Sequence, residues 1–176
     1  MMDNCIHTQR LMLVPLKIDQ LQLALQDMSA LERSMNVNIK RDFITARVQR
    51  AIGMKIEKMQ KSDEAQHNWF TYWLIIIQPE QVGAGMLGFK GFPDQTGSTE
   101  IGYGIDEMYQ GRGYMSEAVQ RLVDWAFTHP FCQTITATEV ENPASRRLLE
   151  KLGARLVNTT DHSTSWEIRR PAQVSE

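Results

Sequence analysis

Two closely spaced glycines join a strand pattern to a helix pattern beyond the middle of the chain. Residues 99–105 alternate between apolar and small or polar side chains, which indicates a strand. Residues 115–126 carry apolar side chains at the spacing of an amphipathic helix. Between them, Gly111 and Gly113 flank Arg112. Such a turn can point successive backbone N–H groups at one place, and the start of the helix adds a partial positive charge. The segment therefore predicts a binding site for a phosphate group.

The patterns around this segment predict one domain, 1–176, built on a mixed sheet. A strand pattern at 135–138 follows the helix, which favours two parallel strands with a right-handed connection. Upstream, strand patterns at 69–77, 82–89 and 99–105 are separated by short turns, as in an antiparallel meander. Further strands are expected at 8–16, 156–157 and 164–168, and further helices at 18–31, 42–59 and between Asn142 and Gly153. We expect an α+β fold (mixed α/β), with a mostly antiparallel sheet of six to seven strands and about four helices.

The composition excludes several classes of protein. Apolar residues make up 42% and charged residues 23%, as in an ordinary soluble globular protein. The longest apolar run, 73–77, is far too short to span a bilayer, so we expect no membrane association. Asp3 and Asn4 stand where a signal peptide would need a basic start and an apolar stretch. A cytoplasmic location is therefore expected.

Charge and cysteine content narrow the partners further. The net charge of −2 argues against nucleic acid as the main partner. Residues 94–141 contain eight acids against two bases, a segment that could attract a cationic substrate or form an ordinary solvated surface. Cys5 and Cys132 lack the spacing of a metal site, and no paired histidines accompany them. We expect no metal.

A dinucleotide is one ligand that the glycine loop allows. Gly111, Gly113 and Ser116 occupy the three positions of a dinucleotide fingerprint, and Glu139 lies where a ribose-binding acid would stand. However, the loop follows an antiparallel meander in mid-chain, and serine replaces the glycine that permits close packing of helix on strand. An NAD-type binder remains the minor interpretation.

Four segments in order favour another ligand. They are residues 8–13 (Thr-Gln-Arg-Leu-Met-Leu), residues 100–103 (Glu-Ile-Gly-Tyr), the loop 110–118 and the helix 142–153. Together they resemble the GNAT superfamily of acyl-CoA-dependent N-acetyltransferases, over roughly residues 8–168. Within it, the chain is most similar to the N-terminal acetyltransferases of ribosomal proteins (the RimJ/RimL-like branch). This resemblance implies an acyl-CoA N-acyltransferase fold, whose sheet splays apart at the cofactor between strands 99–105 and 135–138.

The resemblance also implies acetyl-CoA as co-substrate and assigns residues to it. The pyrophosphate would be wrapped by backbone N–H groups of the loop residues Gln110, Gly111, Arg112, Gly113, Tyr114 and Met115. Met115 departs from the family pattern, which has glycine or alanine there. Main-chain groups of Ile105 would face the pantetheine arm, as would Asn142, whose alternative role is a helix cap. Arg146 would reach the nucleotide phosphates, or would be an ordinary exposed helix arginine.

The implied reaction is direct attack of a neutral amine on the thioester in a ternary complex. An amine must first lose a proton, and Glu100 is the candidate base, with a solvated strand-end carboxylate as its alternative. Ser145 is the candidate proton donor to the departing thiolate, or a solvated serine in the first helical turn. Many family members have a tyrosine acid seven residues after the asparagine, but this chain has Leu149 there. Tyr103, opposite Glu100 on its strand, is expected in the core.

The expected function is transfer of an acetyl group to a primary amine, on a protein N-terminus or a small molecule. The absent tyrosine and Met115 keep a second hypothesis open, a catalytically weak acyl-CoA-binding module or sensor. Gly104, where the branch often has tryptophan, predicts extra space near the thioester. The acceptor itself is left open, and so is a homodimer.

Overall fold

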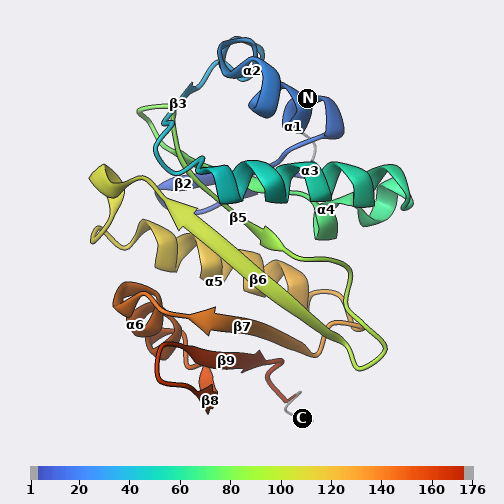
Figure 1. The fold of residues 1–176 in the computed structure, drawn as a ribbon, viewed down its shortest axis with the longest axis vertical. Coiled ribbons are helices and arrows are strands. Elements are labelled where there is room, and N and C mark those ends of the chain that lie inside the picture. The colour runs from blue at the N-terminus through green and yellow to red at the C-terminus, as the bar shows by residue number, and fades with distance from the viewer. Residues whose placement is uncertain (1–3, 173–176) are drawn as a thin grey trace.

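One mixed sheet runs through residues 4–172, the part of the chain that this computed structural model describes (Figure 1). Its strands lie in the order β1-β2-β4-β5-β6-β7-β9-β8, and β3 pairs separately with β5. Only the pairs β3–β5 and β6–β7 are parallel. The strands are β1 (Ile6–His7), β2 (Leu11–Pro15), β3 (Asn38–Ile39), β4 (Trp73–Ile77), β5 (Val82–Phe89), β6 (Ser98–Ile105), β7 (Thr134–Val140), β8 (Arg155–Thr159) and β9 (Thr164–Arg169). The expected α+β fold with a mostly antiparallel sheet is confirmed.

Helices cover both faces of this sheet. In residues 4–172 they are α1 (Ile18–Gln26), α2 (Met28–Met35), α3 (Ala46–Gln60), α4 (His67–Phe70), α5 (Tyr114–Phe127) and α6 (Pro143–Lys151), with 3₁₀ turns η1 (Glu64–Gln66) and η2 (Glu107–Tyr109). None of the helices within these limits is long and apolar enough to cross a membrane.

The element count exceeds the expected six to seven strands and about four helices for local reasons. The strands β1 and β3 are two residues long each, too short to leave a sequence pattern. The helix expected at 18–31 is divided at Asp27, whose carboxylate accepts a hydrogen bond from the Ala30 N–H at 3.0 Å and caps α2.

The strand expected at 69–77 begins only at Trp73. Residues 67–70 form α4 instead, and this turn buries the Trp69 ring against Phe89 and Trp125, with ring centroids 5.1 and 4.8 Å away. Packing of the aromatic ring has overridden its preference for a strand.

Each face of the sheet has its own hydrophobic core. One core joins the sheet to α5 and α6, and we call this side the α5 face. The other joins it to α1, α2 and α3, and we call it the α3 face. Side chains alternate between them along each strand, so Leu13 lies on the α5 face and Met12 on the α3 face. In Figure 1, β6 crosses in front of α5, and α3 lies beside the upper part of the sheet.

The strands β6 and β7 separate after a short paired stretch. They pair in parallel only where Ser98–Glu100 meets Thr134–Thr136. Beyond this point β6 runs on to Ile105 and β7 to Val140 with no pairing between them. On its other side β6 stays paired with β5 throughout residues 101–105. The sheet therefore opens into a gap between β6 and β7, at the place expected from the sequence.

Candidate active site

Main-chain groups of β6 line one side of this gap. The N–H of Lys90 donates to the Glu100 carbonyl, and the N–H of Asp106 donates to the Ala84 carbonyl, each at 2.8 Å. Even-numbered residues of β6 therefore bond to β5. Because backbone groups alternate sides along a strand, those of Tyr103 and Ile105 point into the gap, beyond the parallel pairing that ends where Glu100 meets Thr136. An extended ligand with amide groups can pair there as an added strand does.

The glycine loop closes the open end of the gap. It leads from η2 into α5, and both of its glycines have the left-handed backbone that suits glycine, with φ of 71° at Gly111 and 80° at Gly113. Gly113 is the N-terminal cap residue of α5, whose first N–H groups have no partner within the helix. This is the geometry of an anion site at a helix N-terminus.

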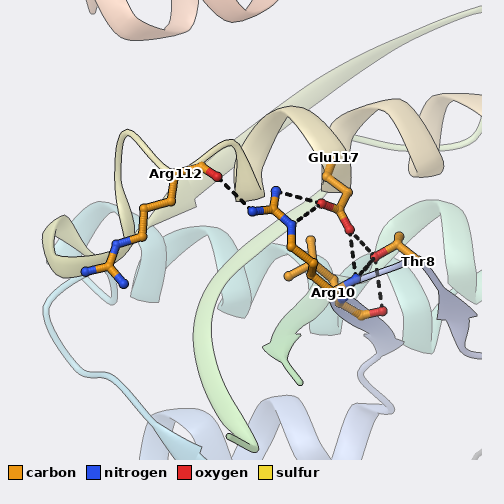
Figure 2. Close-up of polar contacts among 5 residues, drawn as sticks. Thr8, Arg10, Arg112 and Glu117 are labelled. Atoms are coloured by element: carbon orange, nitrogen blue, oxygen red, sulfur yellow. Dashed lines mark hydrogen bonds and ion pairs between the residues drawn. The ribbon is translucent and has the colours of Figure 1, made fainter. Parts of the chain in front are cut away.

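An ion-pair brace fixes this loop to the first part of the chain (Figure 2). The Arg10 guanidinium lies 2.7 Å from Glu117 Oε2 through both Nε and Nη2, and its Nη1 donates to the Arg112 carbonyl at 2.9 Å. Glu117 Oε1 accepts hydrogen bonds from the Thr8 hydroxyl at 2.5 Å and from the Arg10 N–H at 3.1 Å. Burial raises the pKa of Glu117, but these hydrogen bonds outweigh it and hold the pKa below its usual value. We call Thr8, Arg10 and Glu117 the loop brace.

The side chains of the loop contact the surrounding fold or remain exposed. The ring of Tyr114 packs against the Arg10 guanidinium, whose carbon Cζ lies 4.5 Å from the centroid of that ring. Met115 is half-buried against the core of the α5 face, so its length takes no room from the loop. Gln110 donates to the Ile105 carbonyl at 3.4 Å, which ties the loop to the end of β6. Arg112 is exposed.

The start of α6 stands beside the same open end, because it follows the end of β7. Asn142 caps this helix: its Oδ1 accepts from the Ala144 N–H at 2.8 Å, so its amide NH₂ is left to donate elsewhere. Arg146 is less available than expected. Its Nε and Nη2 lie 3.4 Å from the carbonyls of Val140 and His162. A role for Arg146 at nucleotide phosphates stays a prediction.

Glu100 stands at the closed end of the gap, on the α3 face. Its Oε1 lies 2.5 Å from Lys90 Nζ and accepts from the Thr138 hydroxyl at 2.6 Å. Thr138 lies on β7 beyond the last paired residue, so the carboxylate bridges the two strands where they part. Above Gly102 and Gly104 on the same face, an added Cβ would meet nothing within 4 Å. Open space therefore lies next to the carboxylate, and the expected space near a thioester stays a prediction.

Tyr103 and Ser145 meet on the other side, the α5 face. The ring of Tyr103 packs against the core, as expected, but its hydroxyl is buried without a hydrogen-bond partner among residues 4–172. The hydroxyl of Ser145 is its neighbour, without a hydrogen bond of normal geometry between them. Burial raises the pKa of Tyr103, and the Ser145 hydroxyl offsets part of that effect.

Sequence patterns missed two of these features. The loop brace joins residues more than a hundred positions apart, although the segment 8–13 stood out as a motif. The unpaired Tyr103 hydroxyl leaves no pattern of its own. Within the described part of the chain, no cluster of histidine, cysteine or carboxylate side chains could hold a metal ion.

The splayed sheet and the glycine loop before α5 form the kind of site that suits an extended, phosphate-bearing ligand. The family model of the acetyltransferase (GNAT) domain matches residues 10–155. The chain belongs to this acetyltransferase family.

Relatives and solved structures agree with this assignment. The uncharacterized N-acetyltransferase p20 of Bacillus licheniformis is 32% identical over 84% of this chain and 80% of its own length. The uncharacterized N-acetyltransferase YjdG of Bacillus subtilis is 35% identical over 55% of this chain, and the match spans 58% of that protein. The ribosomal-protein-serine acetyltransferase of Escherichia coli is 27% identical over 50% of this chain and 49% of its own length.

Two solved structures share the fold at low identity. A RimL ribosomal L7/L12 alpha-N-protein acetyltransferase in complex with coenzyme A has a TM-score of 0.64 at 18% identity, over 94% of this chain and 98% of its own. The ribosomal-protein-S5-alanine acetyltransferase of Vibrio fischeri has a TM-score of 0.63 at 19% identity, over 96% and 97%.

Proposed function

We propose that the protein transfers the acetyl group of acetyl-CoA to a primary amine, on a protein N-terminus or a small molecule. The gap between β6 and β7 carries this proposal. It leads from the glycine loop at its open end to Glu100 at its closed end, past main-chain groups that β7 leaves unpaired. The fold relatives include a protein in complex with coenzyme A.

The residues present fit acetyl-CoA, which supplies the activated acetyl group as a thioester. The N–H groups from Gln110 to Met115 would hold its pyrophosphate at the start of α5. The N–H of Ile105, whose carbonyl accepts from Gln110, and the amide of Asn142 would pair with its pantetheine arm. Each of these assignments uses donors and acceptors that no neighbouring strand occupies.

The acceptor amine would approach on the α3 face. Glu100 stands there next to open space, and as the candidate base it would take the proton that the amine loses. A pocket of about 950 Å³ lies further along the same side, between α2, β3 and η2, and offers room for a peptide N-terminus or a small molecule. Ser145 stands on the opposite face, where it can donate to the departing sulfur.

Substitution of the base tests the proposal. Glu100→Gln should leave the Kd for acetyl-CoA within about twofold and lower kcat by about 10² to 10⁴, because only proton removal is lost. Glu57→Gln, an exposed position on α3, is the control and should keep full activity. Measurements are calorimetric binding of acetyl-CoA and release of coenzyme A with a panel of amines. The panel should include peptides that begin with serine or alanine, since relatives carry those names.

Two other hypotheses give different results. A catalytically weak acyl-CoA-binding module or sensor, which Leu149 in place of the tyrosine acid favours, would bind acetyl-CoA without releasing coenzyme A to any amine. An NAD-type binder would be stabilised by NAD and not by acetyl-CoA. A wild-type protein that gains no thermal stability at saturating acetyl-CoA would overturn the proposal. The cytoplasmic location and the homodimer stay predictions, the latter open to sedimentation analysis.

A further inference from the structure

A primary amine of the chain itself touches the candidate base. Lys90 directly follows β5, and its Nζ lies 2.5 Å from Glu100 Oε1. Among the lysines of residues 4–172, it is the only one that forms an ion pair with a carboxylate. Lys55 and Lys58 donate to main-chain carbonyls instead. A lysine amine therefore stands at the carboxylate where the proposed function needs the amine of an acceptor.

The main chain of Lys90 is held from two sides, while its side chain is accessible. Its N–H donates to the Glu100 carbonyl at 2.8 Å, and its carbonyl accepts from Lys58 Nζ at 2.8 Å. The side chain is 62% exposed. An exposed ion pair contributes little to stability, so the ammonium can leave the carboxylate and return to it. A fixed backbone thus presents a mobile amine at Glu100.

This contact lies where β6 and β7 part. Glu100 Oε1, the oxygen that meets Lys90, also accepts from the hydroxyl of Thr138 on β7 at 2.6 Å. The next residue of β6 on the same face is Gly102, above which an added Cβ would meet nothing within 4 Å. The carboxylate that holds the amine therefore borders open space and the gap in which the proposed function places acetyl-CoA.

We propose that the protein acetylates its own Lys90 on Nζ, with acetyl-CoA as the donor and Glu100 as the base, and this rests on the proposed function. One proton of the ammonium goes to Glu100 and on to water, and the nitrogen lone pair bonds to the thioester carbonyl carbon. The carbon–sulfur bond breaks, and its electron pair stays on sulfur. The nitrogen then loses a second proton, which ends on the sulfur as a thiol. The products are an acetylated Lys90, coenzyme A and one proton in solution.

The competing interpretation is an ordinary cross-strand ion pair, which antiparallel neighbours of opposite charge form. Such a pair gives Lys90 no advantage over other exposed lysines toward acetyl-CoA. By contrast, an amine held at a base in the same molecule reacts without the encounter of a second protein molecule, so its rate does not depend on protein concentration. The reactivity of Lys90 therefore separates the two interpretations.

The test follows the transfer of isotope-labelled acetyl groups from acetyl-CoA to the wild-type protein, with no outside amine. Mass spectrometry of proteolytic fragments measures the label at each lysine. Lys90 should gain label at least about 10 times faster than the exposed Lys61, the internal reference for uncatalysed acetylation. The rate at Lys90 should not change with protein concentration. Glu100→Gln should lower it at least about 10-fold and leave the rate at Lys61 unchanged.

Two arginine variants complete the test. Lys90→Arg keeps the positive charge but offers no amine, so it should gain no fast label and should keep the Kd for acetyl-CoA within about twofold. Lys61→Arg is the matched control and should be labelled at Lys90 like the wild type.

Three results contradict self-acetylation. Equal rates at Lys90 and Lys61 leave a cross-strand ion pair only. A first-order rate constant at Lys90 that grows with protein concentration shows transfer between molecules. A Glu100→Gln protein with the wild-type rate at Lys90 shows uncatalysed acetylation. Release of coenzyme A with an outside amine but without label at Lys90 overturns self-acetylation alone, whereas a wild type that does not bind acetyl-CoA overturns the proposed function.

Discussion

At the scale of single residues, Lys55 is the most unusual charge in the fold. Its side chain is buried in the α3 face, where Nζ donates to the carbonyls of Phe89 at 2.7 Å and Phe70 at 3.1 Å and lies 4.4 Å from the centre of the Tyr72 ring. No carboxylate pairs with it in the described residues. Burial lowers the pKa of Lys55 to about 7, and the nearby charges of Lys58 and Lys90 add to the effect.

This lysine predicts a specific dependence of stability on pH. The unfolded chain holds the Lys55 proton up to its ordinary pKa of about 10.4, whereas the folded chain releases it near 7, so stability should rise with pH between these values. The slope should approach ~1.4 kcal/mol per pH unit, and Lys55→Met should lack it. Urea unfolding of both proteins at several pH values measures this. Lys61→Met, at an exposed position after α3, should behave as wild type. Parallel curves for wild type and Lys55→Met would contradict the prediction.

The geometry of some residues at the candidate site could be predicted from the amino-acid sequence, and that of others could not. The cap at Asn142 and the left-handed glycines of the loop follow from local rules, so their geometry could be predicted. The carboxylate of Glu100 could be singled out, but its bonds to Lys90 and Thr138 depend on three strands meeting. The hydroxyl of Tyr103 could not be found, because its lack of a partner is a property of the packed core.

At the scale of elements, the loop brace connects the entry to β2 with the start of α5. Both parts were expected from sequence, β2 from its alternating leucines and α5 from its amphipathic pattern, but the contact between them was not. The brace holds the carbonyl of Arg112 and so limits the directions in which the loop N–H groups can point. Under the proposed function, the brace positions the loop that would hold the pyrophosphate.

Removal of the brace should affect stability and donor binding together. Arg10→Ala should lower the free energy of unfolding by about 1–2 kcal/mol, because three charged hydrogen bonds are lost and Glu117 stays half-buried. It should also raise the Kd for acetyl-CoA several-fold. Arg121→Ala is a matched control on α5, where the arginine makes only an exposed contact with Asp124 at 3.7 Å, and should change stability by less than about 0.5 kcal/mol. Calorimetry and chemical unfolding give both values. Equal effects of the two substitutions would exclude the brace as a positioning device.

Local sequence patterns also explain which helices and strands were predicted with nearly correct bounds. The helices α5 and α6 carry amphipathic spacing, and α6 begins at the capping residue Asn142, so their existence and ends were predicted closely. By contrast, β1 and β3 exist only because β2 and β5 offer edges to pair with. The short helix α4 exists because the Trp69 ring finds an aromatic cluster to enter. Such elements depend on partners distant in sequence.

At the scale of the whole molecule, the sheet is two paired sections that share a short seam. The seam is the stretch where Ser98–Glu100 meets Thr134–Thr136. On one side of the gap β6 is held by β5, and on the other β7 is held by β9. Each section of the sheet therefore keeps its own strand pairing, although the gap separates β6 from β7. Glu100 and Tyr103 lie on opposite faces of the sheet because side chains alternate along β6.

Backbone hydrogen exchange can show this arrangement directly. Amides of Gly102 and Gly104 donate to β5 by the alternation of backbone groups, whereas those of Tyr103 and Ile105 face the gap beyond the last pair with β7. In the free protein, exchange along β6 should therefore be slow at the two glycines and fast at Tyr103 and Ile105. Saturation with acetyl-CoA at about 100 times its Kd should slow the fast pair by up to about 100-fold, as the pantetheine arm occupies the gap.

Gly102 and Gly104 serve as controls within the same strand, because their bonds to β5 exist in both states. Equal protection of all four amides in the free protein, measured by NMR, would show that the gap is closed in solution. Slowing that spares Tyr103 and Ile105 would place the donor elsewhere.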